Sequence, residues 1–217
     1  MTNKRGRLIV LEGIDGAGKT TQAVLLEEYL RGQGRDVIRT AEPTGFPSGV
    51  ALRRALGGAD QKSECEMAVM FVLDRIAHNI HPTEGLIALL ERGTDIICDR
   101  YYYSTLAYQG QSTDYEWVRE MNLRCPEITH PDVCIYLDLQ PEQSLERIRA
   151  GRDHLEIYEN EETLRRVRNA FFSVFEDPAV TDRIEIVNAY RTPEEIAEQI
   201  AQIVDSLPLT ATEAKNG

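Results

Sequence analysis

The sequence predicts an α/β fold in which a parallel β-sheet is covered by helices on both faces. Short apolar runs alternate with longer segments whose apolar residues recur at helical spacing, as in successive βαβ units. Polar residues with chemical capability directly follow several of the apolar runs, and ligands of such sheets bind beyond the carboxyl ends of the strands. A chain of 217 residues with 42% hydrophobic and 28% charged residues has the composition of an ordinary globular protein.

Five strands are expected, over residues 7–11, 36–40, 95–98, 132–139 and 184–187. Apolar periodicity predicts helices over residues 21–32, 49–56, 64–79, 83–92, 115–123 and 141–151, and a further helix that ends near Phe175. The last helix follows Thr192, with Glu195 at the capping-box position. We expect one domain over residues 1–206, without internal repeats, and a polar, disordered tail over residues 207–217.

The loop after the first strand fits the spacing G-x-x-x-x-G-K-[ST] of a phosphate-binding P-loop. Its glycines allow successive backbone N–H groups to point at phosphate oxygens, and the following helix adds its N-terminus to the anion site. The lysine supplies a positive charge and the threonine hydroxyl a ligand for Mg²⁺. The predicted nucleotide-binding residues are Gly13, Ile14, Asp15, Gly16, Ala17, Gly18, Lys19, Thr20 and Thr21.

Bulk properties exclude several classes of function. A net charge of −12 argues against a surface for nucleic acids or membranes, because both need clustered Lys and Arg. The apolar run after Arg7 is too short for a signal peptide or a membrane span. None of the four cysteines has zinc-like spacing, and Cys98 and Cys134 lie in apolar runs, so we expect reduced thiols in a cytoplasmic protein.

Three further patterns could carry chemistry. Asp99 follows an apolar strand, as a Mg²⁺-binding carboxylate does in P-loop enzymes, and Arg100 is placed to meet a phosphate. The same pair could instead be a surface ion pair at a strand end. The charged segment 147–162 could be a lid that closes over a nucleotide or a solvated loop. Phe71 and Arg75 share one helix face, where Phe71 on the pattern alone is more often a core residue.

Taken together, these motifs resemble the thymidylate kinase family over about residues 7–205. The resemblance is carried by the P-loop with Glu12, by Glu42-Pro43, by Phe71 with Asp74-Arg75, by Asp99-Arg100-Tyr101, and by Ala107-Tyr108-Gln109-Gly110. It implies a three-layer P-loop kinase fold with a small lid over about residues 149–162. It also implies an enzyme of nucleotide biosynthesis that transfers phosphate from ATP to dTMP with Mg²⁺, acting as a homodimer.

The resemblance also implies roles for individual residues. Asp15 would bind the sugar 3′-hydroxyl of dTMP, Phe71 would stack on thymine, and Arg75 would hydrogen-bond the edge of the base. Tyr108 would crowd the sugar 2′ position, with Gln109 beside it near the base. Arg53 and Arg100 would hold the acceptor phosphate, which the Glu42-Pro43 loop would approach, with a cis peptide bond expected before Pro43. Thr20 and Asp99 would hold the metal.

The family supplies its catalytic arginine either from the P-loop or from the lid. Because the P-loop position here is Gly16, the lid should provide it, with Arg152 the first candidate and Arg149 the second. Asp153 and Glu156 would help to position arginines or the metal. Catalysis would then be alignment of two phosphates with charge stabilisation by Lys19, Mg²⁺ and the arginines, including Arg100.

Three alternatives stay open at this point. A deoxynucleoside kinase or another nucleoside-monophosphate kinase would share the P-loop and a strand-end Asp-Arg. A P-loop GTPase would need an N-K-x-D signature, which the chain lacks. A catalytically silent nucleotide-binding protein would not need intact Lys19, Thr20, Asp99 and Arg100.

Overall fold

The computed structural model describes residues 5–151 and 160–208. Its centre is a five-stranded sheet in the order β2-β3-β1-β4-β5, in which every neighbouring pair is parallel. The strands are β1 (Leu8–Glu12), β2 (Val37–Ala41), β3 (Asp95–Asp99), β4 (Val133–Asp138) and β5 (Ile184–Asn188). The predicted parallel sheet is confirmed.

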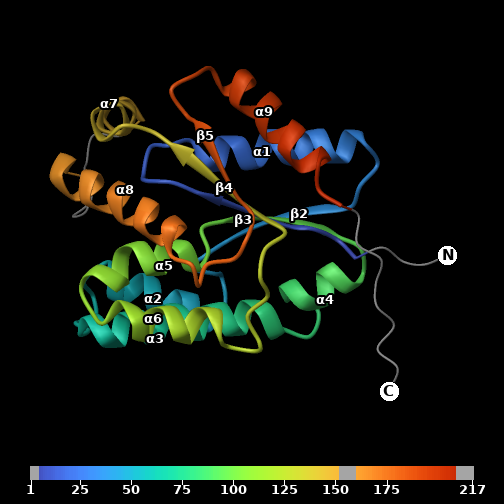
Figure 1. Ribbon diagram of the computed structural model, residues 1–217. Helices are drawn as coiled ribbons and strands as arrows, with labels where there is room; N and C mark the ends of the chain where they lie inside the picture. Colours follow the sequence, from blue (N-terminus) through green and yellow to red (C-terminus); the bar gives the residue numbers. More distant parts are fainter. Residues whose placement is uncertain (1–4, 152–159, 209–217) are drawn as a thin grey trace.

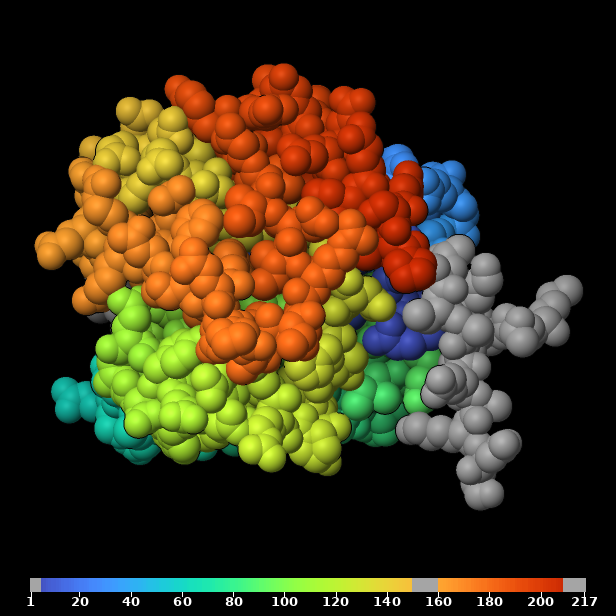
Figure 2. All heavy atoms as spheres, in the orientation of Figure 1, coloured from blue at the N-terminus to red at the C-terminus, as the bar shows by residue number. Residues whose placement is uncertain are grey.

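Helices cover both faces of the sheet (Figure 1). They are α1 (Lys19–Gly32), α2 (Pro47–Leu56), α3 (Glu64–Ile80), α4 (Leu86–Glu91), α5 (Tyr102–Tyr108), α6 (Tyr115–Leu123), α7 (Pro141–Gly151), α8 (Glu161–Glu176) and α9 (Pro193–Asp205), with a short 3₁₀ helix at Gln109–Gln111. In the space-filling view of the same orientation, the orange and red C-terminal part of the chain forms much of the visible face (Figure 2).

Each face of the sheet has its own hydrophobic core because successive strand residues point to opposite sides. Ile9 and Leu11 of β1 pack with α1 and α9 on one side. Leu8 and Val10 of the same strand pack with α3, α4, α5, α6 and α8 on the other. The central strands are therefore buried on both faces, which explains why they read as unbroken apolar runs.

Most expected elements are present, and the differences have local causes. The helix expected over residues 83–92 spans only Leu86–Glu91, because the chain first makes a tight turn in which the Gly85 N–H donates to the His81 carbonyl. Helix α5 was not predicted, since nearly all of its residues are buried and no polar face marks it. The capping box of α9 at Thr192 and Glu195 is confirmed.

The carboxyl ends of the strands meet at one edge of the sheet. Register pairs Leu11, the next-to-last residue of β1, with Asp99 at the end of β3, and Ala41 of β2 also pairs with Asp99. The P-loop and the Glu42-Pro43 loop therefore leave the sheet next to Arg100.

Leu207, which we placed at the start of the tail, is buried in the core beside α9. Among the described residues, no helix has both the length and the apolar character needed to cross a membrane.

Candidate active site

The P-loop connects β1 to α1 with a backbone that only glycines adopt readily. Gly13, Gly16 and Gly18 all have positive φ, and Gly18 is the N-cap of α1 in the left-handed conformation. No side chain caps the first turn of α1. Its N–H groups, with the positive end of the helix dipole, therefore face the loop and form an anion site.

Lys19 lies inside this loop with only 7% of its side chain exposed. Its Nζ donates to the carbonyl oxygens of Gly13 at 3.0 Å and Ile14 at 3.1 Å. Burial, reinforced by the nearby charge of Arg100, lowers the pKa of the Lys19 ammonium to about 8. A phosphate bound in the loop would offset both the burial and the repulsion from Arg100, and would therefore favour the charged ammonium.

Two oxygen donors face each other beside the loop. The Thr20 hydroxyl donates to Asp99 Oδ2 at 3.1 Å, which joins the start of α1 to the end of β3. A hydroxyl and a carboxylate at this separation suit Mg²⁺, which proteins bind with few carboxylates alongside phosphate oxygens. The described residues contain no cluster of three or more His, Cys, Asp or Glu that would form an all-protein metal site.

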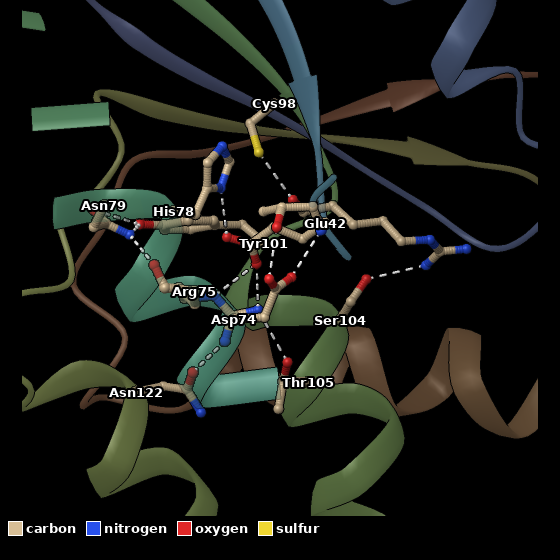
Figure 3. A network of polar contacts seen from close by, with 12 residues as sticks. Glu42, Asp74, Arg75, His78, Asn79, Cys98, Tyr101, Ser104, Thr105 and Asn122 are labelled. Atoms are coloured by element: carbon tan, nitrogen blue, oxygen red, sulfur yellow. Dashed lines mark hydrogen bonds and ion pairs between the residues drawn. The ribbon is translucent and has the colours of Figure 1, made fainter. Parts of the chain in front are cut away.

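The Glu42-Pro43 loop after β2 has the expected cis peptide bond. Glu42 is buried, and two side chains of α3 contact its carboxylate (Figure 3). Arg75 forms an ion pair with it at 2.7 Å, and His78 Nδ1 lies 3.0 Å from its Oε1. Arg53 of α2 donates to the Pro43 carbonyl at 2.7 Å. Two helices thus fix the position of this loop.

Asp74 fixes the next part of the same loop. Its carboxylate accepts hydrogen bonds from the Thr44 N–H at 2.7 Å, the Thr44 hydroxyl at 2.6 Å and the Ser48 hydroxyl at 2.7 Å. Asp74 is 1% exposed. The Asp74-Arg75 dipeptide therefore holds the loop with one side chain and Glu42 with the other.

Arg75 is 1% exposed, and its donors are largely occupied. Besides Glu42, the guanidinium donates to Thr105 Oγ1 at 3.1 Å and to Asn122 Oδ1, and it lies 5.1 Å from the centre of the Tyr101 ring (Figure 3). Asn122 is itself completely buried. The network holds the guanidinium rigidly at the wall of a cavity.

That cavity, which we call the Phe71 cavity, has a volume of about 350 Å³. It is lined by eight of the residues that the sequence analysis assigned to the site: Asp15, Glu42, Pro43, Phe71, Arg75, Arg100, Tyr108 and Gln109. Phe71 is thus not a core residue but a cavity wall. A second cavity of about 680 Å³, the P-loop cavity, is lined by residues 15–22, Asp99 and Arg100. Asp15 and Arg100 line both cavities and form their common wall.

Arg100 adopts a strained backbone. Its φ is 67°, and it is the one non-glycine residue with positive φ among those that the structure describes. Such a conformation costs about 1–2 kcal/mol for a residue with a Cβ atom. The side chain forms an ion pair with Asp15 and donates to the Ser104 hydroxyl at 3.0 Å. The conformation therefore directs a positive charge at the wall between the cavities.

A family model described as thymidylate kinase matches residues 11–200. The chain belongs to the thymidylate kinase family. A probable thymidylate kinase from Pyrococcus abyssi (strain GE5 / Orsay) is 38% identical over 207 residues, which cover 92% of this chain and 96% of that protein. A thymidylate kinase from Leifsonia xyli subsp. xyli (strain CTCB07) is 39% identical over 208 residues, 92% of this chain and 94% of that protein.

The candidate arginines of this thymidylate kinase family member are not all at the cavities. Arg149 is exposed on α7 and is not among the residues that line either cavity. Arg53 is exposed and contacts the Glu42-Pro43 loop rather than a cavity. Arg152, Asp153 and Glu156 lie outside the described residues.

Several residues at the site were not assigned a role from the sequence. Arg166 of α8 lines the Phe71 cavity, and Arg147 and Arg191 line the P-loop cavity. The Ser144 hydroxyl of α7 donates to the Asp15 carbonyl. These residues come from helices or loops far along the chain, and no motif marks them. Glu12 carried a signal, because a carboxylate directly ends an apolar strand there.

Gly16 is closely covered by α7. A Cβ atom at Gly16 would lie 2.8 Å from the Ser144 carbonyl oxygen and 3.1 Å from a side-chain carbon of Ile148. Its φ of 77° also disfavours any other residue. In this kinase the P-loop therefore has no room for a side chain at position 16.

Proposed function

We propose that this chain catalyses ATP + dTMP → ADP + dTDP. An oxygen of the dTMP phosphate attacks the γ-phosphorus of ATP, and the bond from that phosphorus to the oxygen bridging the β-phosphate breaks. The observation that carries the proposal is the common wall of Asp15 and Arg100 between the Phe71 cavity and the P-loop cavity. Two nucleotides bound on either side of it would present their phosphates to each other, and such alignment supplies much of phosphoryl-transfer catalysis.

The P-loop cavity would hold ATP. The N–H groups of residues 13–21 would surround its phosphates, and Lys19 would move from the Gly13 and Ile14 carbonyls to phosphate oxygens. Thr20 and Asp99 would hold Mg²⁺, which would neutralise charge on the β- and γ-phosphates when bound.

The Phe71 cavity would hold dTMP. Phe71 would stack on thymine, and Arg75, held by Glu42 and Asn122, would donate to the edge of the base. Tyr108 would exclude a 2′-hydroxyl, and Gln109 would lie beside the base.

The phosphate of dTMP would lie at the common wall. Arg100 would hold it, and the Glu42-Pro43 loop, braced by Arg53, would approach it. Asp15 would exchange its ion pair with Arg100 for a hydrogen bond from the sugar 3′-hydroxyl.

A lid arginine would complete the charge stabilisation of the transition state. The closed packing around Gly16 supports a source outside the P-loop. Arg152 is the first candidate and Arg149, an exposed residue in the last turn of α7, the second. Such a residue would stabilise the oxygens that carry charge as the γ-phosphoryl group is transferred.

A homodimer is the proposed assembly, through an apolar stripe on α3 and α2. Val69, Leu73 and Ile80 are spaced along one face of α3 and are 45–57% exposed, with Val50 of α2 also exposed. Such exposed apolar patches mark interaction surfaces.

The free thiols of all four cysteines support a reducing, cytoplasmic setting.

Coupled ADP release with ATP, Mg²⁺ and one acceptor at a time tests the proposal. We expect dTMP to be the preferred acceptor, ahead of dUMP, CMP, AMP and thymidine. Preference for thymidine would identify a deoxynucleoside kinase, and preference for CMP or AMP another nucleoside-monophosphate kinase. ADP binding without turnover of any acceptor would contradict an enzymatic role.

A further inference from the structure

The peptide group that follows Arg100 is held at both of its ends. Its N–H, which belongs to Tyr101, donates to Glu12 Oε1 at 2.8 Å, and its carbonyl accepts from the Cys98 thiol at 3.1 Å. The N–H of Arg100 itself donates to the Leu11 carbonyl at 3.0 Å. These three hydrogen bonds hold the backbone of Arg100 in its strained conformation, with a φ of 67°.

Glu12 is the centre of these contacts and is completely buried. Besides the Tyr101 N–H, its carboxylate accepts the Ser104 N–H at 3.0 Å, and thus caps the N-terminus of α5 from the end of β1. No side chain of the preceding residues caps that helix. Burial raises the pKa of the Glu12 carboxyl, while the charge of Arg100 and the helix N-terminus favour its ionised form.

Glu12 also reaches the Arg100 side chain through one intermediate. The Ser104 hydroxyl donates to Glu12 Oε2 at 2.7 Å and accepts from Arg100 Nη1 at 3.0 Å. A serine hydroxyl has a single proton. That proton points at Glu12 Oε2, so a lone pair of the hydroxyl oxygen faces the guanidinium.

We infer that Glu12 and Ser104 are positioning residues for Arg100, and that they determine how tightly the acceptor's phosphate is bound. Glu12 fixes the backbone of Arg100 through Tyr101, and it orients the Ser104 hydroxyl that holds the guanidinium. This inference rests on the proposed function, in which Arg100 binds the phosphate of dTMP. Glu12 is completely buried and is not among the residues that line the Phe71 cavity, whereas Ser104 does line it.

Glu12→Gln tests the inference with almost no change of shape. The amide oxygen can still accept the two backbone N–H groups, but the amide nitrogen then donates to Ser104. The hydroxyl proton of Ser104 must turn away from position 12, toward the guanidinium. The variant therefore reverses the contact that holds Arg100 while it keeps a cap on α5.

The readout is calorimetric binding of dTMP and of thymidine, which lacks the phosphate. We expect Glu12→Gln to weaken dTMP about tenfold, as for loss of one charge-assisted hydrogen bond, and to leave thymidine within about twofold. ADP binding, measured alongside, separates an effect at Arg100 from a general change in the P-loop, since Glu12 also acts electrostatically on Lys19.

A double-mutant cycle with Arg100→Ala distinguishes positioning from a merely structural role. If Glu12 acts through Arg100, Glu12→Gln causes no further loss of dTMP affinity in the Arg100→Ala background. Equal losses in both backgrounds would overturn the inference, because the carboxylate would then act by another route.

Ser104→Ala is the second variant and keeps the test decisive if Glu12→Gln does not fold. It removes the hydroxyl but leaves both backbone contacts of Glu12, and we expect weaker dTMP binding with unchanged thymidine binding. An unchanged ratio of the two affinities in the folded variants overturns the inference. Failure of the proposed function has a different signature, because wild-type protein would then not phosphorylate dTMP in the ADP-release assay.

Discussion

Lys19 gives the site a pH dependence whose sign follows from its pKa of about 8. Bound phosphates favour the ammonium and raise this pKa. At a pH at which Lys19 of the nucleotide-free protein is partly neutral, ATP binding is therefore accompanied by uptake of a proton. We expect ATP affinity to fall as the pH rises from about 8 to about 9, since the pKa of free Lys19 lies at the start of that range.

Calorimetry in two buffers of different ionisation enthalpy at pH about 8.5 measures that proton uptake. Lys19→Met is the matched control, because it keeps the length of the side chain without a titrating group. Equal proton uptake by the wild type and by Lys19→Met would show that another group is responsible.

Tyr108 is expected to determine the choice of sugar. Its ring lies 5.6 Å from the Arg100 guanidinium carbon, and burial raises its pKa to about 12, so the phenol stays neutral. We predict that Tyr108→Ala improves use of the ribonucleotide analogue of dTMP about tenfold relative to dTMP, the scale of steric discrimination in such pockets. Ratios of kcat/KM measure the effect. Tyr108→Phe should keep the wild-type ratio, and a shift there as large as that of Tyr108→Ala would contradict a steric role.

Residues with partners close in sequence, or within a recognisable motif, could be predicted. Lys19, Thr20 and Asp99 follow from the P-loop and the strand-end carboxylate. Glu12 stands out in the sequence as a carboxylate that ends an apolar strand, but the roles of Glu12 and Asn122 depend on contacts with α5 and α3, which the sequence does not contain. A single sequence gives the type of a residue but not its distant partners.

Helix α3 combines two functions on different faces. Asp74, Arg75 and His78 face the site, while Leu73, 57% exposed, lies on the apolar stripe. We predict that Leu73→Glu halves the mass measured by light scattering, from a dimer to the 24.6 kDa chain, because a charge in an apolar interface is strongly unfavourable.

The matched control for Leu73→Glu is Ile186→Glu on β5, which is 48% exposed and lies away from α3. It should leave the mass unchanged. A wild type that already has the mass of one chain would contradict the proposed dimer. A Leu73→Glu variant that remains a dimer would show that the dimer forms through another surface.

Elements with an amphipathic pattern were predicted well: α6 has the predicted bounds, and α8 ends one residue beyond Phe175, the end that the pattern predicted. Helix α5 has the opposite character: residues 102–107 are all buried, so no polar face alternates with an apolar one. Its N-terminal cap comes from Glu12, far away in the sequence, and no local signal starts the helix. Elements of this kind depend on tertiary packing rather than on local preference.

A buried charge cluster joins distant parts of the molecule at the amino edge of the sheet. Asp95, completely buried, accepts from Arg7 Nη2 at 2.7 Å and from Arg35 Nη2 at 2.7 Å, while Arg7 Nη1 donates to the Val204 carbonyl at 3.0 Å. We predict that Asp95→Asn lowers the free energy of unfolding by about 3–5 kcal/mol, because two arginines lose their buried partner.

Urea unfolding at pH 7 measures this loss, with Asp60→Asn as control. Asp60 pairs with Arg54 where both side chains are well exposed, so its loss should cost under about 1 kcal/mol. Similar values for the two variants would show that burial does not strengthen the cluster.

The same cluster has a defined response to acid. Burial raises the pKa of Asp95, but hydrogen bonds from Arg35 and Arg7 outweigh it, and the net shift is downward. Its stabilisation is thus complete above the ordinary carboxyl pKa of about 4 and is lost as the pH falls through the lower folded value. Asp95→Asn should lack this part of the acid sensitivity.

At the scale of the whole molecule, the location of the site was predictable and its interior was not. Parallel strands place their carboxyl ends at one edge, so the P-loop, Glu42 and Arg100 had to meet there. The common wall of two cavities depends on side-chain conformations, such as the left-handed Arg100, which the strand pattern does not contain.

The close approach of α7 to Gly16 has a consequence for descent. Any amino-acid substitution at that position adds at least a Cβ atom, which would meet the backbone of Ser144 at 2.8 Å. An arginine there would first require the neighbouring helix to move, so a substitution at position 16 alone cannot give the loop the catalytic charge that we propose comes from the lid. An arginine in the P-loop and an arginine in the lid would then be alternatives that substitutions in the loop alone cannot interchange, because the backbone of α7 would also have to move.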